Sequence, residues 1–153
     1  MNIEKGLERG VLYIVATPIG NNDDMSSRAR EILIACDRVA AEDTRRAARL
    51  LAELGGNRRK LISLHEHNER KLVDYVLGEL VTGASVALVS DSGTPLLSDP
   101  GYRLVNAASS SGISIRPIPG PSSIIAALSV CPLPAHPFYF VGFLPKKKKL
   151  EIL

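Results

Sequence analysis

Short runs of apolar residues alternate along this chain with segments in which apolar residues recur every three or four positions. The runs have the length of buried β-strands, and they fall at 12–16, 38–42, 61–64, 85–89 and 113–117. The segments between them have the spacing of one face of a helix, and they fall at about 26–36, 44–54, 70–80, 102–110 and 124–129. The pattern therefore predicts five strands, each followed by a helix, and a last extended piece at 138–141.

This alternation is typical of the α/β class. We expect a mostly parallel sheet of five strands with helices on both faces. The length of 153 residues corresponds to one domain. Ser26 and Ser27 can cap the first helix, and Gly55-Gly56 predicts the end of the second. Residues 1–11 are expected to form a tail, 12–145 the domain, and 146–153 the start of a linker.

Polar loops follow the predicted strands, and the carboxyl ends of parallel strands share one edge of the sheet, where ligands bind in open α/β sheets. The loops are 17–24, 43–46, 65–69 and 90–101, and 119–123 brings a helix N-terminus to the same edge. The loop 90–101 is rich in Gly, Pro, Ser and Asp and is longer than a plain turn requires. We interpret it as a binding loop.

The composition favours a cytosolic protein and permits an anionic partner without requiring one. The formal net charge is +3 and the pI is about 9.0, which permits binding to an anion. Arginines cluster at 45, 46 and 49, and further basic residues at 58–60 and 146–149. No apolar run approaches the roughly 20 residues of a membrane span, and the first nine residues lack the apolar stretch of a signal peptide. Cys36 and Cys131 are expected to be buried thiols that act as small hydrophobic residues.

Several common chemistries lack their signature in this sequence. It has neither the G-x-G-x-x-G pattern of dinucleotide binding nor the P-loop pattern. His65 and His67 stand close to Glu66 and Glu69, but a zinc site needs more ligands at tetrahedral spacing. We therefore expect loop histidines and no metal.

Six ordered segments carry a resemblance. They are 12–21 (LYIVATPIGN), 40–45 (AAEDTR), 63–69 (SLHEHNE), 87–95 (ALVSDSGTP) with 98–102 (SDPGY), 119–123 (PGPSS) and 142–146 (GFLPK). From about residue 12 to 147 the chain resembles the small-subunit ribosomal RNA methyltransferases of the tetrapyrrole methylase superfamily. The resemblance implies two α/β domains with S-adenosylmethionine in the cleft between them. It also implies methyl transfer to the ribose 2′-hydroxyl of a cytidine in 16S rRNA, within the small ribosomal subunit.

The resemblance also implies which residues meet the cofactor, namely Pro18, Ile19 and Gly20 after the first strand, Asp91, Gly93, Thr94, Pro95 and Leu97 in the loop 90–101, and Ser122 and Ser123 before the last helix. Small side chains and backbone donors allow close approach, and a helix N-terminus suits a carboxylate. Ser92 departs from the family pattern, in which we expect Ala, and we expect the change to be tolerated.

A 2′-hydroxyl is a poor nucleophile until it loses its proton, so a general base is expected. Glu42, Asp43 and Asp99 are the candidates at the sheet edge, although Glu42 and Asp43 could equally cap a helix or pair with Arg45. The candidates for phosphate contacts are Arg45, Arg46, Lys146 and Lys147. His65, His67 and Asn68 are the candidates for contact with an unstacked base or ribose.

The family has a second domain after the Phe-Leu-Pro-Lys segment. We therefore expect this chain to be the N-terminal half, with weak cofactor binding and little activity alone. Members of the superfamily are often dimers, so a homodimer is a further expectation.

Three alternatives stay open. An apolar cleft the size of a macrocycle would favour a small-molecule methylase of the same superfamily. The run Asp91-Ser92-Gly93-Thr94 partly matches the phosphotransferases of the haloacid dehalogenase type, but Ser92 replaces their second Asp and the run follows the fourth strand. Salt-dependent RNA binding without methyl transfer would indicate a non-catalytic domain that binds RNA or dimerises.

Overall fold

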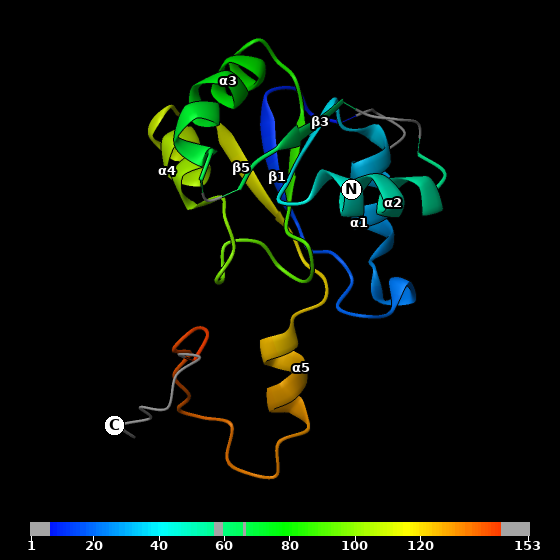
Figure 1. Ribbon diagram of the computed structural model, residues 1–153, viewed down its shortest axis with the longest axis vertical. Coiled ribbons are helices and arrows are strands. Elements are labelled where there is room, and N and C mark those ends of the chain that lie inside the picture. Colours follow the sequence, from blue (N-terminus) through cyan, green and yellow to red (C-terminus); the bar gives the residue numbers. More distant parts are fainter. Residues whose placement is uncertain (1–6, 57–59, 66, 145–153) are drawn as a thin grey trace.

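The structure is a computed structural model that describes residues 7–56, 60–65 and 67–144. Within these residues the strands form a five-stranded sheet in the order β3-β2-β4-β1-β5, and every pair of neighbours is parallel. The strands are β1 (Val11–Val15), β2 (Arg38–Ala41), β3 (Lys60–Ser63), β4 (Val86–Val89) and β5 (Ser114–Ile118). The predicted parallel α/β sheet is confirmed (Figure 1).

The helices also follow the prediction closely. They are α1 (Ser27–Ala35), α2 (Thr44–Glu53), α3 (Glu69–Val81), α4 (Tyr102–Ser110) and α5 (Ser123–Ser129), with a short 3-10 helix η2 (Asn22–Asp24) before α1. The Ser26 hydroxyl caps α1 by accepting a hydrogen bond from the Ala29 amide at 3.2 Å, as expected. Residues 138–141 carry no regular secondary structure, because they follow α5 away from the sheet and have no strand beside them (Figure 1).

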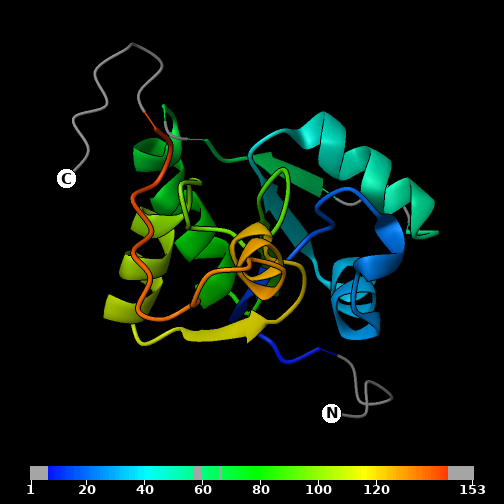
Figure 2. The ribbon, with the colours of Figure 1, turned by 90° about the horizontal axis from the view of Figure 1, so that it is seen from below.

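Helices cover both faces of the sheet, as the alternating side chains of the strands require. Val11, Tyr13 and Val15 of β1 pack into one cluster with buried residues of α1 and α2. Leu12 and Ile14 point to the opposite face and pack with residues of α3 and α4. The side chains of both clusters are almost completely buried. Cys36 belongs to the first cluster, as expected, but the expectation that Cys131 is buried is wrong: it follows α5 away from the sheet and is exposed. Figure 2 shows α1 and α2 on one side of the sheet and α3 and α4 on the other.

β2 and β4 are neighbours in the sheet, and the connections that leave these two strands run toward opposite edges of the sheet. The chain after β2 runs over one face through α2 to β3, and the chain after β4 runs over the opposite face through α4 to β5. The connections therefore diverge at the carboxyl ends of two adjacent strands. Such a point is where open α/β sheets hold their ligands.

Gly101 ends the long loop after β4 and stands before α4. Its φ is +121°, a backbone conformation that L side chains rarely adopt. A Cβ at this position would lie 2.6 Å from Leu88 Cδ2 in the core. The missing side chain of Gly101 therefore allows the backbone to pass close to Leu88 of β4 just before α4 begins.

We expect Gly101→Ala to lower the free energy of unfolding by about 3 kcal/mol, because backbone strain and overpacking add together. The matched control is Gly55→Ala, where φ is +74° but a Cβ would meet nothing within 4 Å. This control isolates the strain and should cost about 1–2 kcal/mol. Urea denaturation measures both losses, and equal losses in the two variants would contradict the packing argument.

Candidate functional site

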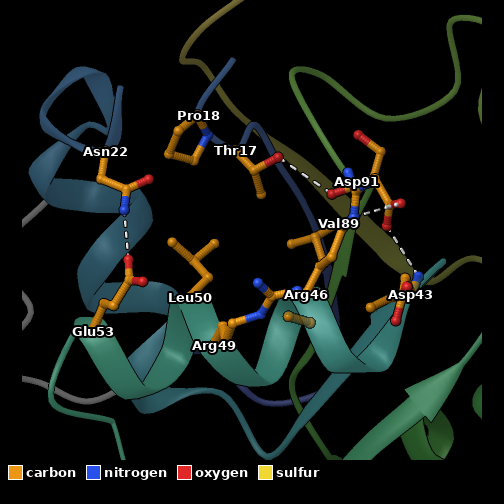
Figure 3. A pocket seen from close by; sticks show the side chains of 13 residues that line it. Thr17, Pro18, Asn22, Asp43, Arg46, Arg49, Leu50, Glu53, Val89 and Asp91 are labelled. Carbon is orange, nitrogen blue, oxygen red and sulfur yellow. Dashed lines mark hydrogen bonds and ion pairs between the residues drawn. The ribbon is translucent and has the colours of Figure 1, made fainter. Parts of the chain in front are cut away.

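Two neighbouring cavities, of about 320 Å³ each, are formed by described residues at the carboxyl edge of the sheet. We call them the α2 cavity and the α5 cavity. The α2 cavity (Figure 3) is lined by Thr17, Pro18, Asn22, Ala41, Asp43, Arg46, Ala47, Arg49, Leu50, Glu53, Val89, Ser90 and Asp91. The α5 cavity is lined by Asp91, Ser92, Gly93, Thr94, Leu97, Ser98, Asp99, Ser122, Ser123, Ile124, Phe140, Gly142 and Phe143. Asp91 lines both.

The α5 cavity brings together most of the residues that we expected to meet the cofactor. They are Asp91, Gly93, Thr94, Leu97, Ser122 and Ser123. Pro18 lines the α2 cavity instead. Three further candidates line neither cavity: Ile19, whose Cγ2 lies against the position of Gly93, the exposed Gly20, and the buried Pro95.

Hydrogen bonds hold three loops together at this cavity. Thr17 and Gly93 exchange two backbone hydrogen bonds, of 2.9 and 3.1 Å. The Thr94 hydroxyl donates to the Pro121 carbonyl at 3.2 Å. This bond ties the loop after β4 (residues 90–101, the β4 loop) to the segment before α5. The Ser92 hydroxyl donates to the Pro18 carbonyl at 3.3 Å, so the serine at this position adds a contact between loops.

The β4 loop is held in a strained conformation. Leu96 has a φ of +82° and Ser98 a φ of +64°, values that non-glycine residues adopt at a cost of about 1–3 kcal/mol each. Such strain persists only where the surroundings determine the conformation, and it gathers at functional sites. Here it lies in the loop that forms one wall of the α5 cavity.

The candidate bases divide into two kinds. Asp43 accepts hydrogen bonds from the Arg45 backbone amide at 2.8 Å and from the Arg45 guanidinium, also at 2.8 Å. These bonds hold the pKa of Asp43 well below its usual range. Asp43 therefore caps α2 and pairs with Arg45, and an ionised, engaged carboxylate of low pKa is a weak base.

Glu42 and Asp99 have the opposite electrostatics. Burial, followed by the charges of Asp91 and Asp99, raises the pKa of Glu42. Burial raises the pKa of Asp99 as well, against a hydrogen bond from Ser90, and the charge of Asp91 adds to the increase. A raised pKa brings a carboxylate closer to the range of an efficient general base at neutral pH.

Asp91 joins the two loops that diverge at β2 and β4. Its Oδ1 accepts a hydrogen bond from the Asp43 amide at 3.0 Å, and its Oδ2 lies 3.5 Å from Arg46 Nε. Asp91 therefore positions the start of α2 in addition to lining both cavities.

The predicted RNA-contacting residues are distributed around this edge. The Arg45 side chain is 87% exposed although it pairs with Asp43. His65 is partly buried at the end of β3 and its ring centroid lies 6.0 Å from that of His67. Both polar groups of the Asn68 side chain bond to backbone, the carbonyl to His65 N–H and the amide to Ser63 O, each at 2.8 Å. Asn68 therefore shapes its own loop, and Lys146 and Lys147 lie outside the described residues.

Glu69 is a residue whose role the sequence did not reveal. It begins α3, is 6% exposed, and its Oε1 accepts hydrogen bonds from the amides of Arg103 at 2.8 Å and Leu104 at 3.2 Å. Gly101 offers α4 no side-chain cap, so Glu69 supplies one from another helix. No local pattern around residues 101–104 indicates this partner, because it lies more than thirty positions away.

The described residues lack both a metal-binding cluster and a membrane-spanning helix. No group of three or more His, Cys, Asp or Glu side chains is arranged to hold a metal ion. No helix in this part of the chain is long and apolar enough to cross a membrane.

The parallel sheet and the loops at its carboxyl edge match a known class of protein. The chain belongs to the tetrapyrrole methylase family: the family described as Tetrapyrrole (Corrin/Porphyrin) Methylases matches residues 11–149. Among solved structures, the uroporphyrin-III C-methyltransferase of Thermus thermophilus superposes with a TM-score of 0.59 at 18% identity, over 76% of this chain and 51% of that one. At this identity the likeness shows the fold.

Curated relatives are much more similar in sequence. The chain is 54% identical over 138 residues to a ribosomal RNA small subunit methyltransferase I of Xylella fastidiosa, covering 90% of this chain and 50% of the relative. It is 50% identical over 141 residues to the protein of the same name from Escherichia coli O157:H7, covering 92% and 49%. The chain therefore spans about half the length of these relatives.

The raised pKa of Glu42 predicts a pH dependence of stability. The folded chain holds this proton more tightly than the unfolded chain, so its contribution is fully present below the unfolded pKa and is lost as pH rises through the folded pKa. We expect Glu42→Gln to remove this loss, so that its gain in stability over the wild type grows between about pH 4 and pH 7. Urea denaturation at several pH values measures it. Glu31→Gln, on an exposed part of α1, should leave the profile unchanged, and a constant gain for Glu42→Gln would contradict the argument.

The cap from Glu69 predicts a local effect. Glu69→Ala leaves the amides of Arg103 and Leu104 without their acceptor, and we expect a loss of about 1–3 kcal/mol and faster hydrogen exchange at the start of α4. The control is Asp37→Ala. Asp37 accepts hydrogen bonds from the Ser85 amide and hydroxyl at 2.8 and 2.7 Å, at the opposite edge of the sheet. Its loss should leave exchange at α4 unchanged, and equal protection of α4 in both variants would show that Glu69 is not its cap.

Proposed function

We propose that this chain is the cofactor-binding half of an enzyme that transfers a methyl group from S-adenosylmethionine to the ribose 2′-hydroxyl of a cytidine in 16S rRNA. Family membership and the names of the relatives support ribosomal RNA of the small subunit as the substrate. The observation that carries the proposal is the α5 cavity, where the strained β4 loop and the start of α5 meet and Asp99 joins the lining. Glu42 lines neither cavity, but the charge of Asp99 acts on it and raises its pKa, after burial and the charge of Asp91.

The residues of the α5 cavity fit this cofactor. Ser122 and Ser123 offer hydroxyl groups, and the Ser122 side chain makes no capping hydrogen bond within α5. Leu97, Phe140 and Phe143 offer apolar surface for an adenine ring. The volume of about 320 Å³ lies at the lower end of the range for small-molecule sites, so a second wall outside the described residues is consistent with the family's two domains.

S-adenosylmethionine supplies a methyl group bound to a positively charged sulfur. The carboxylates of Asp91 and Asp99 line the cavity, and their negative charge favours a cation there. Glu42 or Asp99 would accept the proton of the 2′-hydroxyl. The new bond from the ribose oxygen to the methyl carbon would replace the carbon–sulfur bond, and S-adenosylhomocysteine would leave as a neutral thioether. The remaining contribution of the chain is to hold the reacting groups in line.

Arg45 and Arg46 contribute exposed guanidinium groups near this edge, and they are proposed to contact RNA phosphates together with Lys146 and Lys147. His65 and His67 are proposed to contact the ribose or base. The homodimer and the cytosolic location stay predictions.

A chimera tests the proposal. We expect this chain to bind S-adenosylmethionine weakly by calorimetry, and the chain continued by the second half of the Xylella relative to bind it tightly. The chimera should transfer labelled methyl groups to small ribosomal subunits that lack the modification, and mapping should place the label on a cytidine ribose.

Two variants serve as controls in the same chimera. Glu42→Gln should retain cofactor affinity, whereas Asp99→Asn removes a negative charge from the cofactor cavity and should weaken binding. The substitution that removes the general base should lower kcat by about 10²–10⁴-fold. If the chimera binds the cofactor but labels only a small molecule, the small-molecule methylase becomes the better assignment. If neither protein binds the cofactor, the proposal fails.

A further inference from the structure

The α2 cavity has no role in the proposed cofactor site, although it lies beside that site. One wall is the face of α2 that carries Arg46, Arg49, Leu50 and Glu53, and the opposite wall contains Thr17, Pro18 and Asn22 (Figure 3). Positions 46, 49, 50 and 53 share a face because they are spaced by three and four residues. Ala47, which also lines the cavity, and Leu51 are buried and anchor α2 in the core.

Arg49 places a positively charged guanidinium in the lining of this cavity. Among the residues that the structure describes, none forms an ion pair or a side-chain hydrogen bond with its guanidinium. The carboxylates around it are all engaged: Asp43 with Arg45, Asp91 with the Asp43 amide, and Glu53 with the Asn22 amide. The nearby Arg46 is 59% exposed and only loosely paired with Asp91, at 3.5 Å. Two guanidinium groups at the same rim therefore remain available to an anion.

Apolar surface completes the cavity. Pro18 and Leu50 line it together with Ala41 and Val89, which end β2 and β4. A ring packs well on such surface while a charged group remains at the rim. Arginine forks match the geometry of phosphate oxygens. A cavity that combines apolar surface with two guanidinium groups is suited to a nucleotide.

The α2 cavity lies next to the proposed cofactor site. Asp91 and the start of the β4 loop separate the α2 cavity from the α5 cavity. A nucleotide in the α2 cavity is therefore a neighbour of the cofactor. RNA nucleotides enter such pockets when they are unpaired and unstacked.

We propose that the α2 cavity binds one unpaired nucleotide of the RNA substrate, with its phosphate on Arg49 and Arg46 and its ring against Pro18 and Leu50. The inference rests on the proposed function and deepens it, because it assigns the substrate a site separate from that of the cofactor.

The test is the salt dependence of RNA binding. The probe is a fluorescent single-stranded oligoribonucleotide of mixed sequence, titrated with this chain at several KCl concentrations. We expect Arg49→Gln to weaken binding about fivefold near 0.1 M salt, and to reduce the slope of log K against log salt by about 0.7, the value for one phosphate contact on a single strand. Arg49→Lys keeps the charge and should restore the slope. Cofactor affinity should not change.

Arg28→Gln is the matched control, because Arg28 is an exposed arginine of the neighbouring helix α1 and does not line the cavity. Circular dichroism and urea denaturation check that each variant folds. Wild-type affinity in Arg49→Gln, an equal loss in Arg28→Gln, or no RNA binding by the wild-type chain would each overturn the inference.

Methylation by the chimera and its KM for small subunits distinguish the cavity assignment from the proposed function. If the chimera methylates ribosomal RNA and Arg49→Gln leaves the KM for small subunits unchanged, the cavity assignment is wrong and the function stands. If the chimera methylates no RNA at all, the proposed function is wrong. A raised KM for subunits at unchanged kcat is the result that supports the cavity.

Discussion

The hydrogen bond from the Asp43 amide to the Asp91 carboxylate closes the point where the chain diverges from two neighbouring strands. On one side of this bond the chain enters α2, and on the other it enters the strained loop that leads to α4. Both cavities at the sheet edge use Asp91 as a shared wall. The same negative charge raises the pKa of Glu42 and of Asp99, after burial. One carboxylate thus sets the geometry and the electrostatics of this edge together.

The fold could be predicted from the sequence because its periodic signals are local. Apolar runs marked each strand, and the caps at Ser26 and Gly55 marked the ends of helices within a residue or two. The strand order could not be predicted in this way, because it depends on which strands meet across the sheet. The segment 138–141 has the composition of a strand but carries no regular structure, since a strand also needs a neighbour to pair with.

The candidate site was predicted in part for the same reason. Residues of the β4 loop and the start of α5 converge on one cavity, as expected for loops at the carboxyl ends of parallel strands. Roles that depend on partners far away in the sequence could not be predicted. Glu69 is an example, because its carboxylate accepts hydrogen bonds from amides of α4. The role of Asp43 could not be predicted either, although its partner is close in sequence, because a carboxylate next to a helix start can be a base or a cap. The bonds to Arg45 make it a cap here.

The cap that Glu69 lends to α4 constrains how this domain can diverge. An insertion between β3 and α3 would move Glu69 and also expose the first amides of α4, so two helices would be disturbed by one change. A side chain at Gly55, just after α2, would by contrast meet nothing within 4 Å. The segment between β3 and α3 is therefore expected to keep a constant length among relatives, whereas position 55 carries no packing constraint of this kind.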